Sequence, residues 1–426
     1  MQTLRSLSFI WRLFRFSFVS LPYFYFAVFP GLIAVIGLLY AKFRQSALDR
    51  PTRNLLLLIT GLLLLSCLFA ANRAEAFLQL ANFLPYLLLF SVLPYLLKGV
   101  EPLARLATDM VIATIPINLL AMLEYVLRAE GIPRWLRRTA LSRWYRARPH
   151  AGRAMVMFGH PNALASYLVL VLGLGLGLIL YYSWQRRQSS MLEGSLAKQP
   201  PLLPKWQMVL LYIGTFSCLL GIFASGSRNG LLVAVGQLLV FSLFTQASRV
   251  ILIAGLVGVA ALVAGAAWFG IGGRSLAVAD WADDPRVGVW RFALGLLRQR
   301  PLLGWGLGNY KLEYPPGLIP DYDFVAHPHN FWLLLAVEAG IPVMLLVTLF
   351  VGRICYRAVR QLGAWSDDPT NRAILLAYLL SFASCVAFAL FDVTFYDARI
   401  NATNWVVLAG LYSLTQKQVR SETTPA

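Results

Sequence analysis

The sequence has few charged residues. Only 13% of its 426 residues are Asp, Glu, Lys or Arg, whereas 58% are hydrophobic, and the mean hydropathy is +0.65. A soluble globular domain carries about 25% charged residues, so this composition excludes that class. Apolar runs of about 20 residues, the length that crosses a bilayer as a helix, recur along the chain. The sequence therefore predicts an α-helical protein that crosses a membrane many times.

Acidic residues and cysteines are also scarce. The 19 acidic residues are outnumbered by 37 Lys and Arg, which gives a formal net charge of +18. The basic residues lie mostly in loops between apolar runs, so we expect membrane lipids or a phosphorylated lipid as partners, and no nucleic acid. The four cysteines lie in or beside apolar runs without metal-ligand spacing and predict no disulfide framework. Because the apolar runs are continuous and not alternating, a transmembrane β-barrel is excluded.

The apolar runs define the predicted membrane spans. We expect them at about 22–41, 54–70, 76–97, 105–127, 157–183, 206–224, 229–246, 249–270, 330–352, 372–392 and 400–415. The basic segment 1–18 is amphipathic and forms either an interfacial helix or one more span. Residues 1–426 are therefore predicted to be a single all-α membrane domain with about 11–12 transmembrane helices.

The loop charges predict the orientation of the spans. Three basic loops fall on one side of the predicted topology, at 42–53, 184–205 and 353–372. Positively charged loops stay in the cytoplasm, so the large loop 271–329 should face the periplasm. One loop breaks the rule, because residues 128–153 carry eight arginines on the translocated side. Either this orientation is wrong, or the outer face attracts a polyanion such as a lipid diphosphate.

The junction between the large loop and the next apolar run is the predicted site of chemistry. It reads His327-Pro328-His329-Asn330, and it holds two of the four histidines. Asn330 is a typical helix N-cap, which places His329 at the mouth of the following span. Histidine is the usual proton acceptor near neutral pH, so His329 is the candidate catalytic base. His327 should point away, beyond Pro328, and the lack of a third nearby His or Cys predicts no metal and no cofactor.

Three arginines are candidates for binding an anion. Arg228 lies in a small-residue hinge between two apolar runs, where Ser225 or Ser227 could cap the next helix. A guanidinium beside a helix N-terminus suits phosphate, because it binds two oxygens at once. Arg286 and Arg291 flank Trp290 in a segment that Pro285 should start as a short amphipathic helix on the membrane surface. The simpler alternatives are a snorkelling arginine for the first of these and a solvated helix for the other two.

Glu338 lies two turns into the span that His329 opens, and Pro342 should kink that span. A carboxylate at this depth is costly to bury. It could be protonated, paired with an arginine, or part of a polar lining.

Four motifs, in order, resemble the O-antigen ligase and polymerase family of bacterial membrane glycosyltransferases. They are Phe158-Gly159-His160-Pro161-Asn162, Ser227-Arg228-Asn229-Gly230, Arg286 to Trp290 with Pro301-Leu302-Leu303-Gly304, and His329-Asn330 with Glu338-x-Gly340. The resemblance covers about residues 155–345. Two positions depart from the pattern: His160 stands where the family more often has Asn, and Asn229 where it often has Gly.

The resemblance implies a GT-C-like fold and metal-independent glycan transfer at the periplasmic face of the bacterial inner membrane. The donor would be a glycan on undecaprenyl diphosphate, and an acceptor hydroxyl would attack the anomeric carbon with inversion. The matching arginines, Arg228, Arg286 and Arg291, would hold the diphosphate. His329 would act on the acceptor, with Trp290, Asn330 and Glu338 in support.

The acceptor stays open at this stage. A ligase would use a lipid core, a polymerase a second lipid-linked repeat, and an O-oligosaccharyltransferase a protein. A transporter is the alternative from another class, because some relatives of the family have been described as inorganic-carbon transport proteins. Asp109, Asn118 and Glu124 lie within one predicted span and are the best argument for transport.

Overall fold

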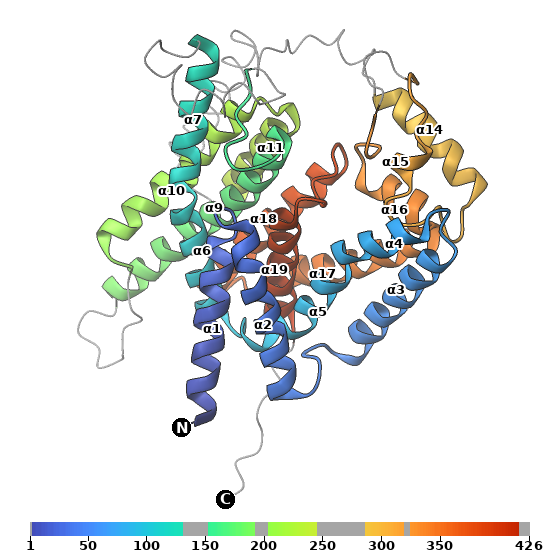
Figure 1. The fold of residues 1–426 in the computed structure, drawn as a ribbon. Coiled ribbons are helices and arrows are strands. Elements are labelled where there is room, and N and C mark those ends of the chain that lie inside the picture. Colours follow the sequence, from blue (N-terminus) through green and yellow to red (C-terminus); the bar gives the residue numbers. More distant parts are fainter. Residues whose placement is uncertain (1, 131–151, 192–202, 245–285, 319–323, 417–426) are drawn as a thin grey trace, which may run out of the picture.

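The computed structural model describes residues 2–130, 152–191, 203–244, 286–318 and 324–416 (Figure 1). Every regular element in these ranges is a helix. The N-terminal half contains α1 (Gln2–Ser20), α2 (Tyr25–Phe43), α3 (Arg50–Leu68), α4 (Arg73–Gln79), η1 (Leu80–Asn82), α5 (Leu84–Val92), η2 (Leu93–Tyr95), α6 (Val100–Ala113), α7 (Ile115–Glu130) and α9 (Pro161–Met191). The C-terminal half contains α10 (Lys205–Ser225), α11 (Arg228–Phe244), α14 (Arg286–Gln299), α15 (Tyr310–Glu313), α16 (Phe331–Ala339), α17 (Ile341–Ala364), α18 (Pro369–Ala389) and α19 (Ala398–Thr415).

The predicted class, an all-α polytopic membrane protein, is confirmed. Eight helical segments of the described part are long and apolar enough to cross a bilayer. They are Tyr25–Phe43, Arg50–Leu68, Arg73–Tyr95, Val100–Leu127, Pro161–Ser190, Lys205–Ser225, Ile341–Ala364 and Pro369–Ala389. The span expected at 249–270 and most of the arginine-rich loop 128–153 lie outside the described residues. The helix expected in segment 1–18 is present as α1.

Helix α9 forms the centre of the molecule. Its apolar window is 89% buried, and α18 and α10 pack along it (Figure 1). Gly173 and Gly177 have the G-x-x-x-G spacing that lets two membrane helices approach closely. A Cβ atom at Gly177 would lie 2.6 Å from the backbone nitrogen of Ala377 on α18, so only glycine permits this contact.

The apolar run after His329 is not one kinked helix. Helix α16 ends at Ala339, Gly340 adopts a positive φ of 92°, and α17 begins at Ile341 with Pro342 in its first turn. The expected kink at Pro342 is therefore a break at Gly340, because proline fits the first turn of a new helix. With nine residues α16 is too short to cross a bilayer, and only α17 is a span.

The glycine-rich loop 301–309 closes against this break. Gly304, Gly306 and Gly308 all have positive φ values, which confirms that these glycines allow tight turns. The loop backbone donates to the last carbonyls of α16, from Trp305 to Val337 at 2.9 Å and from Gly306 to Glu338 at 2.8 Å. A small second core beneath the loop joins α14, α15 and α16. The large loop is thus packed onto the helix that follows it.

Candidate functional site

His329 is held in a strained backbone conformation at the start of α16. Its φ is 51°, in the left-handed region that few residues other than glycine adopt. Asn330 caps α16 as predicted, accepting from the Leu333 backbone N–H at 2.9 Å, and its Nδ2 donates to Leu390 O at 3.0 Å. Trp290 Nε1 donates to Pro328 O at 2.7 Å. Strain that the surroundings maintain in this way is typical of functional sites.

Asp392 is the partner of His329. It lies in the short connection between α18 and α19, it is buried, and its Oδ1 is 3.1 Å from His329 Nδ1. The backbone N–H of Val393 donates to the same oxygen at 2.8 Å, and Asn162 Nδ2 donates to Oδ2. Burial alone would raise the pKa of Asp392, but the hydrogen bond with His329 lowers that pKa well below its usual range.

The ionised Asp392 fixes the tautomer of His329. A carboxylate can only accept hydrogen bonds, so the proton of the neutral imidazole must be on Nδ1, facing Asp392. Nε2 then carries the lone pair and can accept a proton from a hydroxyl group. This is the arrangement by which a buried carboxylate orients a histidine base in other enzymes.

A chain of hydrogen bonds connects this pair to the hinge that carries Arg228. Asn162, in the first turn of α9, accepts from Arg153 Nη2 at 2.8 Å through its Oδ1 while its Nδ2 holds Asp392. Arg153 Nε donates to the carbonyl of Ser225, also at 2.8 Å. The C-terminal end of α10 is thereby held to the same group of residues as His329.

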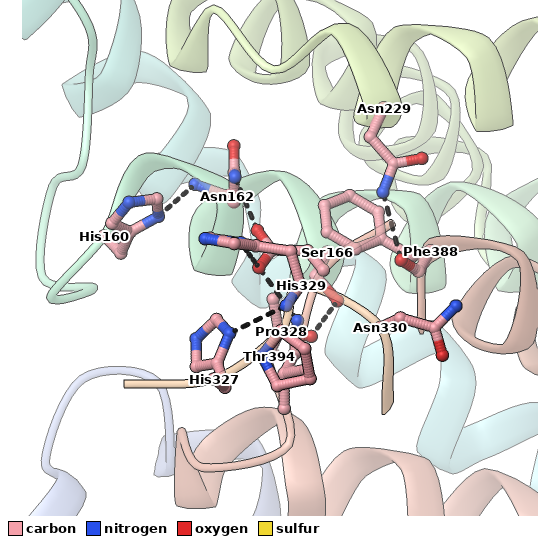
Figure 2. A network of polar contacts seen from close by, with 12 residues as sticks. His160, Asn162, Ser166, Asn229, His327, Pro328, His329, Asn330, Phe388 and Thr394 are labelled. Atoms are coloured by element: carbon pink, nitrogen blue, oxygen red, sulfur yellow. Dashed lines mark hydrogen bonds and ion pairs between the residues drawn. The ribbon is translucent and has the colours of Figure 1, made fainter. Parts of the chain in front are cut away.

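The hinge itself has the predicted form. Gly226 ends α10 with a positive φ of 62°, and Ser227 Oγ accepts from the Gly230 backbone N–H at 3.2 Å to cap α11. Arg228 is the first residue of α11 and is half-buried. The next side chain, Asn229, donates to Phe388 O at 3.1 Å, at the end of α18 from which the Asp392 loop emerges (Figure 2).

Helix α14 carries the two other candidate arginines, in different settings. Arg286 precedes Trp290 by four residues, so the two share a face of the helix, and Trp290 contacts the Pro328 carbonyl. Arg286 is half-buried. Arg291 is exposed, and it lies about 140° around the helix from Arg286. The fold thus brings the Arg286 face to the histidine loop, and it leaves Arg291 on the outer surface of α14.

His327 does not point away from His329, contrary to the expectation from Pro328. The two ring centroids are 4.7 Å apart, and His327 Nδ1 accepts from the His329 backbone N–H at 3.4 Å. Burial lowers the pKa of His327 to about 4, so it is neutral at physiological pH. His327, His329 and Asp392 offer ligand atoms that all lie within 4.8 Å of one another, a set that can bind a transition metal. Asp392 is therefore the third candidate metal ligand, which the sequence did not reveal. Both of its carboxylate oxygens already accept hydrogen bonds.

Within the described part of the chain, the hydrogen bonds to the Glu338 carboxyl group come from neutral donors. It is buried, it accepts from Tyr396 OH at 3.0 Å and from the Tyr310 backbone N–H at 3.3 Å, and Tyr396 belongs to the Asp392 loop. Burial raises the pKa of Glu338 to about 7, and these hydrogen bonds oppose the shift. Glu338 therefore joins α16 to the loop that positions Asp392.

An apolar crevice leads away from Asp392 between helices. Its volume is about 90 Å³. Aromatic and aliphatic side chains of α16, α17, α18 and α19 line it, including Phe331, Val347, Phe382 and Trp405. Asp392, Thr394 and Asn404 are polar residues of the lining, so the crevice adjoins the His329–Asp392 pair.

Asp392, Asn162 and Arg153 were not recognised as site residues from the sequence. Asp392 is 63 positions from His329 and stands alone between two apolar runs. The sequence contains one indication of its role. In the predicted topology, this carboxylate lies at the same membrane face as His329. Asn162 was part of a family-like motif without an assigned role. Arg153 could not be distinguished from the other arginines of its loop.

Part of the chain matches a known protein family. Residues 213–348 match the Wzy_C family model, O-Antigen ligase. The match spans the hinge of Arg228, helix α14 and the histidine loop with α16, and it agrees with the resemblance of the motifs in this part of the chain. No curated protein matched the chain.

Proposed function

We propose that this protein transfers a glycan from undecaprenyl diphosphate to an acceptor hydroxyl, as an O-antigen ligase. The O-antigen ligase match supports a glycan-transfer role in O-antigen biosynthesis, with a lipid-linked donor and an acceptor in the membrane. The observation that carries the proposal further is the His329–Asp392 pair. Asp392 contacts Nδ1 of His329 and so leaves Nε2 for the proposed role as a base, at the start of α16 and beside an apolar crevice.

The proposed reaction is a single displacement with inversion. The acceptor oxygen forms a bond to the anomeric carbon of the donor sugar while its proton passes to His329 Nε2. The bond from that carbon to the diphosphate oxygen breaks, and the electron pair leaves with the diphosphate. Asp392 stabilises the imidazolium that forms, and its negative charge is already in place before the reaction.

Arg228 and Arg286 are the proposed partners of the diphosphate. The leaving group gains negative charge in the transition state, so cations placed there in advance lower the barrier. Arg228 is the first residue of α11, so the N-terminus of this helix lies beside it. The free N–H groups and the dipole of a helix N-terminus favour an anion. Arg291 would act at longer range, because its side chain is exposed on α14. The reaction needs no metal in this scheme, because arginines supply the positive charge.

The crevice between α16, α17, α18 and α19 has room for the first carbons of the donor's polyprenyl tail but not for the whole tail, because its volume is about 90 Å³. Its lining is mostly apolar and includes Asp392. A tail in this crevice would place the diphosphate at the membrane face where the arginines and His329 lie. The charge distribution of the loops supports a periplasmic position for this face.

A transporter is a weaker candidate. The three polar residues that favoured transport are engaged in separate internal contacts. Asp109 pairs with Arg15 of α1, Asn118 donates to Ser217 at 2.9 Å, and Glu124 accepts from the Met155 and Val156 backbone N–H groups. Of these contacts, that between Asp109 and Arg15 joins two ionisable groups, whereas Asn118 and Glu124 bind a hydroxyl and backbone N–H groups. They therefore do not form the series of facing ionisable groups that a transport path needs.

Deletion of the gene tests the proposed function and distinguishes between the three possible acceptors. A ligase deletion should leave a complete lipid core without attached glycan, and long lipid-linked glycan should accumulate. A polymerase deletion should instead leave the core with a single repeat unit, and a protein acceptor would lose its glycan. Unchanged surface and lipid-linked glycans in the deletion strain would contradict glycan transfer of every kind.

A further inference from the structure

A second and larger cavity lies at the opposite end of the membrane helices. Its volume is about 1210 Å³, and it lies between the α2–α3 connection, the end of η2, the C-terminal half of α17 and the end of α19. The charged residues that line it are Asp49, Arg53, Lys98, Arg353, Arg357 and Arg360.

Two membrane helices connect this cavity to the region of the candidate site. Helix α3 begins at the cavity beside Asp49, and near its other end Ser66 donates to Leu303 O at 2.7 Å. Helix α17 follows α16 and reaches the cavity at Arg353. At 1.5 Å per residue, these helices separate the cavity from the candidate site by roughly 20 Å. The cavity is therefore not part of the His329 site.

The cavity is strongly positive. Five cationic side chains and one carboxylate, Asp49, line it. Asp49 Oδ2 lies 3.6 Å from Arg357 Nη2 and 3.9 Å from Arg353 Nη2, and its Oδ1 accepts from Tyr412 OH and from the Thr52 backbone N–H. This carboxylate fixes two arginines of α17 against the start of α3.

The remaining cations stand around this anchored pair. Arg53, Lys98 and Arg360 come from three separate elements and are exposed. Basic loop residues that only determine the orientation of the protein in the membrane need not lie around one cavity. Convergence of this kind predicts an anionic ligand with more than one phosphate or a comparable charge.

Apolar surface continues from the cavity along the two helices. On α17, Leu345, Leu349 and Val359 are each more than half exposed, and Leu57 and Leu58 of α3 are exposed as well. Exposed apolar side chains on membrane helices face acyl chains. A ligand with a charged head and apolar tails would fit both surfaces, and a free phosphate compound would use only the cavity.

We propose that this cavity is a binding site for the headgroup of an anionic phospholipid with two phosphates, in the leaflet opposite the candidate site. The headgroup contacts Arg353 and Arg357 at the base of the cavity and the exposed cations at its rim. The acyl chains lie along α3 and α17. By the loop charges, this is the cytoplasmic leaflet.

Native mass spectrometry of the detergent-purified protein tests the site. The probes are cardiolipin, neutral phosphatidylcholine and inorganic pyrophosphate. Because Arg53 and Arg360 are exposed, the double variant Arg53→Gln/Arg360→Gln should fold normally. The matched control is Arg187→Gln/Lys205→Gln, which removes two exposed charges from the same predicted side but outside the cavity.

The wild type and the control should bind cardiolipin with equal affinity, and the cavity variant should bind it about 30-fold more weakly. Phosphatidylcholine and pyrophosphate should neither bind in the cavity nor compete. Equal cardiolipin binding by all three proteins would overturn the site. Competition of pyrophosphate with cardiolipin would show that the ligand of the cavity is a free phosphate compound and not a lipid.

Discussion

At the scale of residues, the proposed reaction depends on the contact between His329 and Asp392. The structure gives this histidine an ionised partner, a fixed tautomer and a strained backbone. The sequence predicted the histidine and its capping neighbour Asn330, because both follow from local rules for helix termini. It could not predict Asp392 or the nearness of His327, because both depend on how distant segments fold together.

The first prediction concerns Asp392→Asn. The amide keeps the size of the side chain but removes the charge that stabilises the imidazolium and fixes the tautomer. Glycan transfer should fall about 10²–10⁴-fold, with little change in the apparent KM for the donor. The change is measured by initial rates with the purified protein in liposomes. A rate within a few-fold of the wild type would show that Asp392 is only structural.

The second prediction concerns Arg228→Lys. An ammonium cannot reproduce the two-pronged contact of a guanidinium with phosphate oxygens, so most transfer activity should be lost. Arg291→Lys provides the matched control and should retain activity, because that side chain is exposed. Equal losses in the two variants, measured in the same liposome assay, would mean that Arg228 has no special role.

At the scale of elements, the region after the large loop differs most from its prediction. A continuous apolar run suggested one span, but the structure divides it into α16 and α17 at Gly340. The local sequence Gly340-Ile341-Pro342 is compatible with a kink or a break. The choice is made by the loop 301–309, whose backbone packs against Glu338 and Gly340. By contrast, the hinge at Ser227 was predictable, since glycine, serine and the flanking apolar runs all indicate a helix end there.

The third prediction concerns the pH dependence of Glu338, which anchors the end of α16. Its pKa is about 7 in the folded protein and 4.5 as a free side chain, so the folded state binds more protons between these values. Stability should therefore fall as the pH rises from about 4.5 to 7. Glu338→Gln mimics the protonated acid and should avoid this loss.

Thermal unfolding in detergent measures the effect. The melting temperatures of the wild type and Glu338→Gln should agree at pH 4.5, and the variant should be more stable by about 1–3 kcal/mol at pH 8. A constant difference across this pH range would show that Glu338 does not take up the proton.

At the scale of the whole molecule, the protein has two charged ends separated by its membrane helices. One end holds His329 and the candidate arginines, and the other holds the basic cavity of α3 and α17. Composition and run length were sufficient to predict an all-α membrane protein, because bilayer thickness constrains both. The arrangement around α9 was not predictable, since it depends on which helix faces match, as at Gly177 and Ala377.

The fourth prediction concerns orientation. In a background without the four native cysteines, single cysteines at Ala326 and Gly363 should differ in whole cells. An impermeant thiol reagent should label the first through the outer face, and it should label the second only after lysis. Both positions are exposed, so folding alone does not explain a difference. Labelling of the Gly363 position in intact cells would reverse the orientation.

The most direct measurement is glycan transfer by His329→Ala and His327→Asn, reconstituted with a lipid-diphosphate-linked donor and an acceptor. In His327→Asn, the amide oxygen can still accept a hydrogen bond from the His329 backbone N–H, as His327 Nδ1 does. An amide is, however, a much poorer metal ligand than imidazole. Donor binding should be intact in both variants. The rate of glycan transfer should fall about 10²–10⁴-fold in His329→Ala and stay within a few-fold of the wild type in His327→Asn. A loss of only a few-fold in His329→Ala would contradict a base at this position. A collapse of activity in His327→Asn, with chelator-sensitive wild-type activity, would contradict the metal-free reaction.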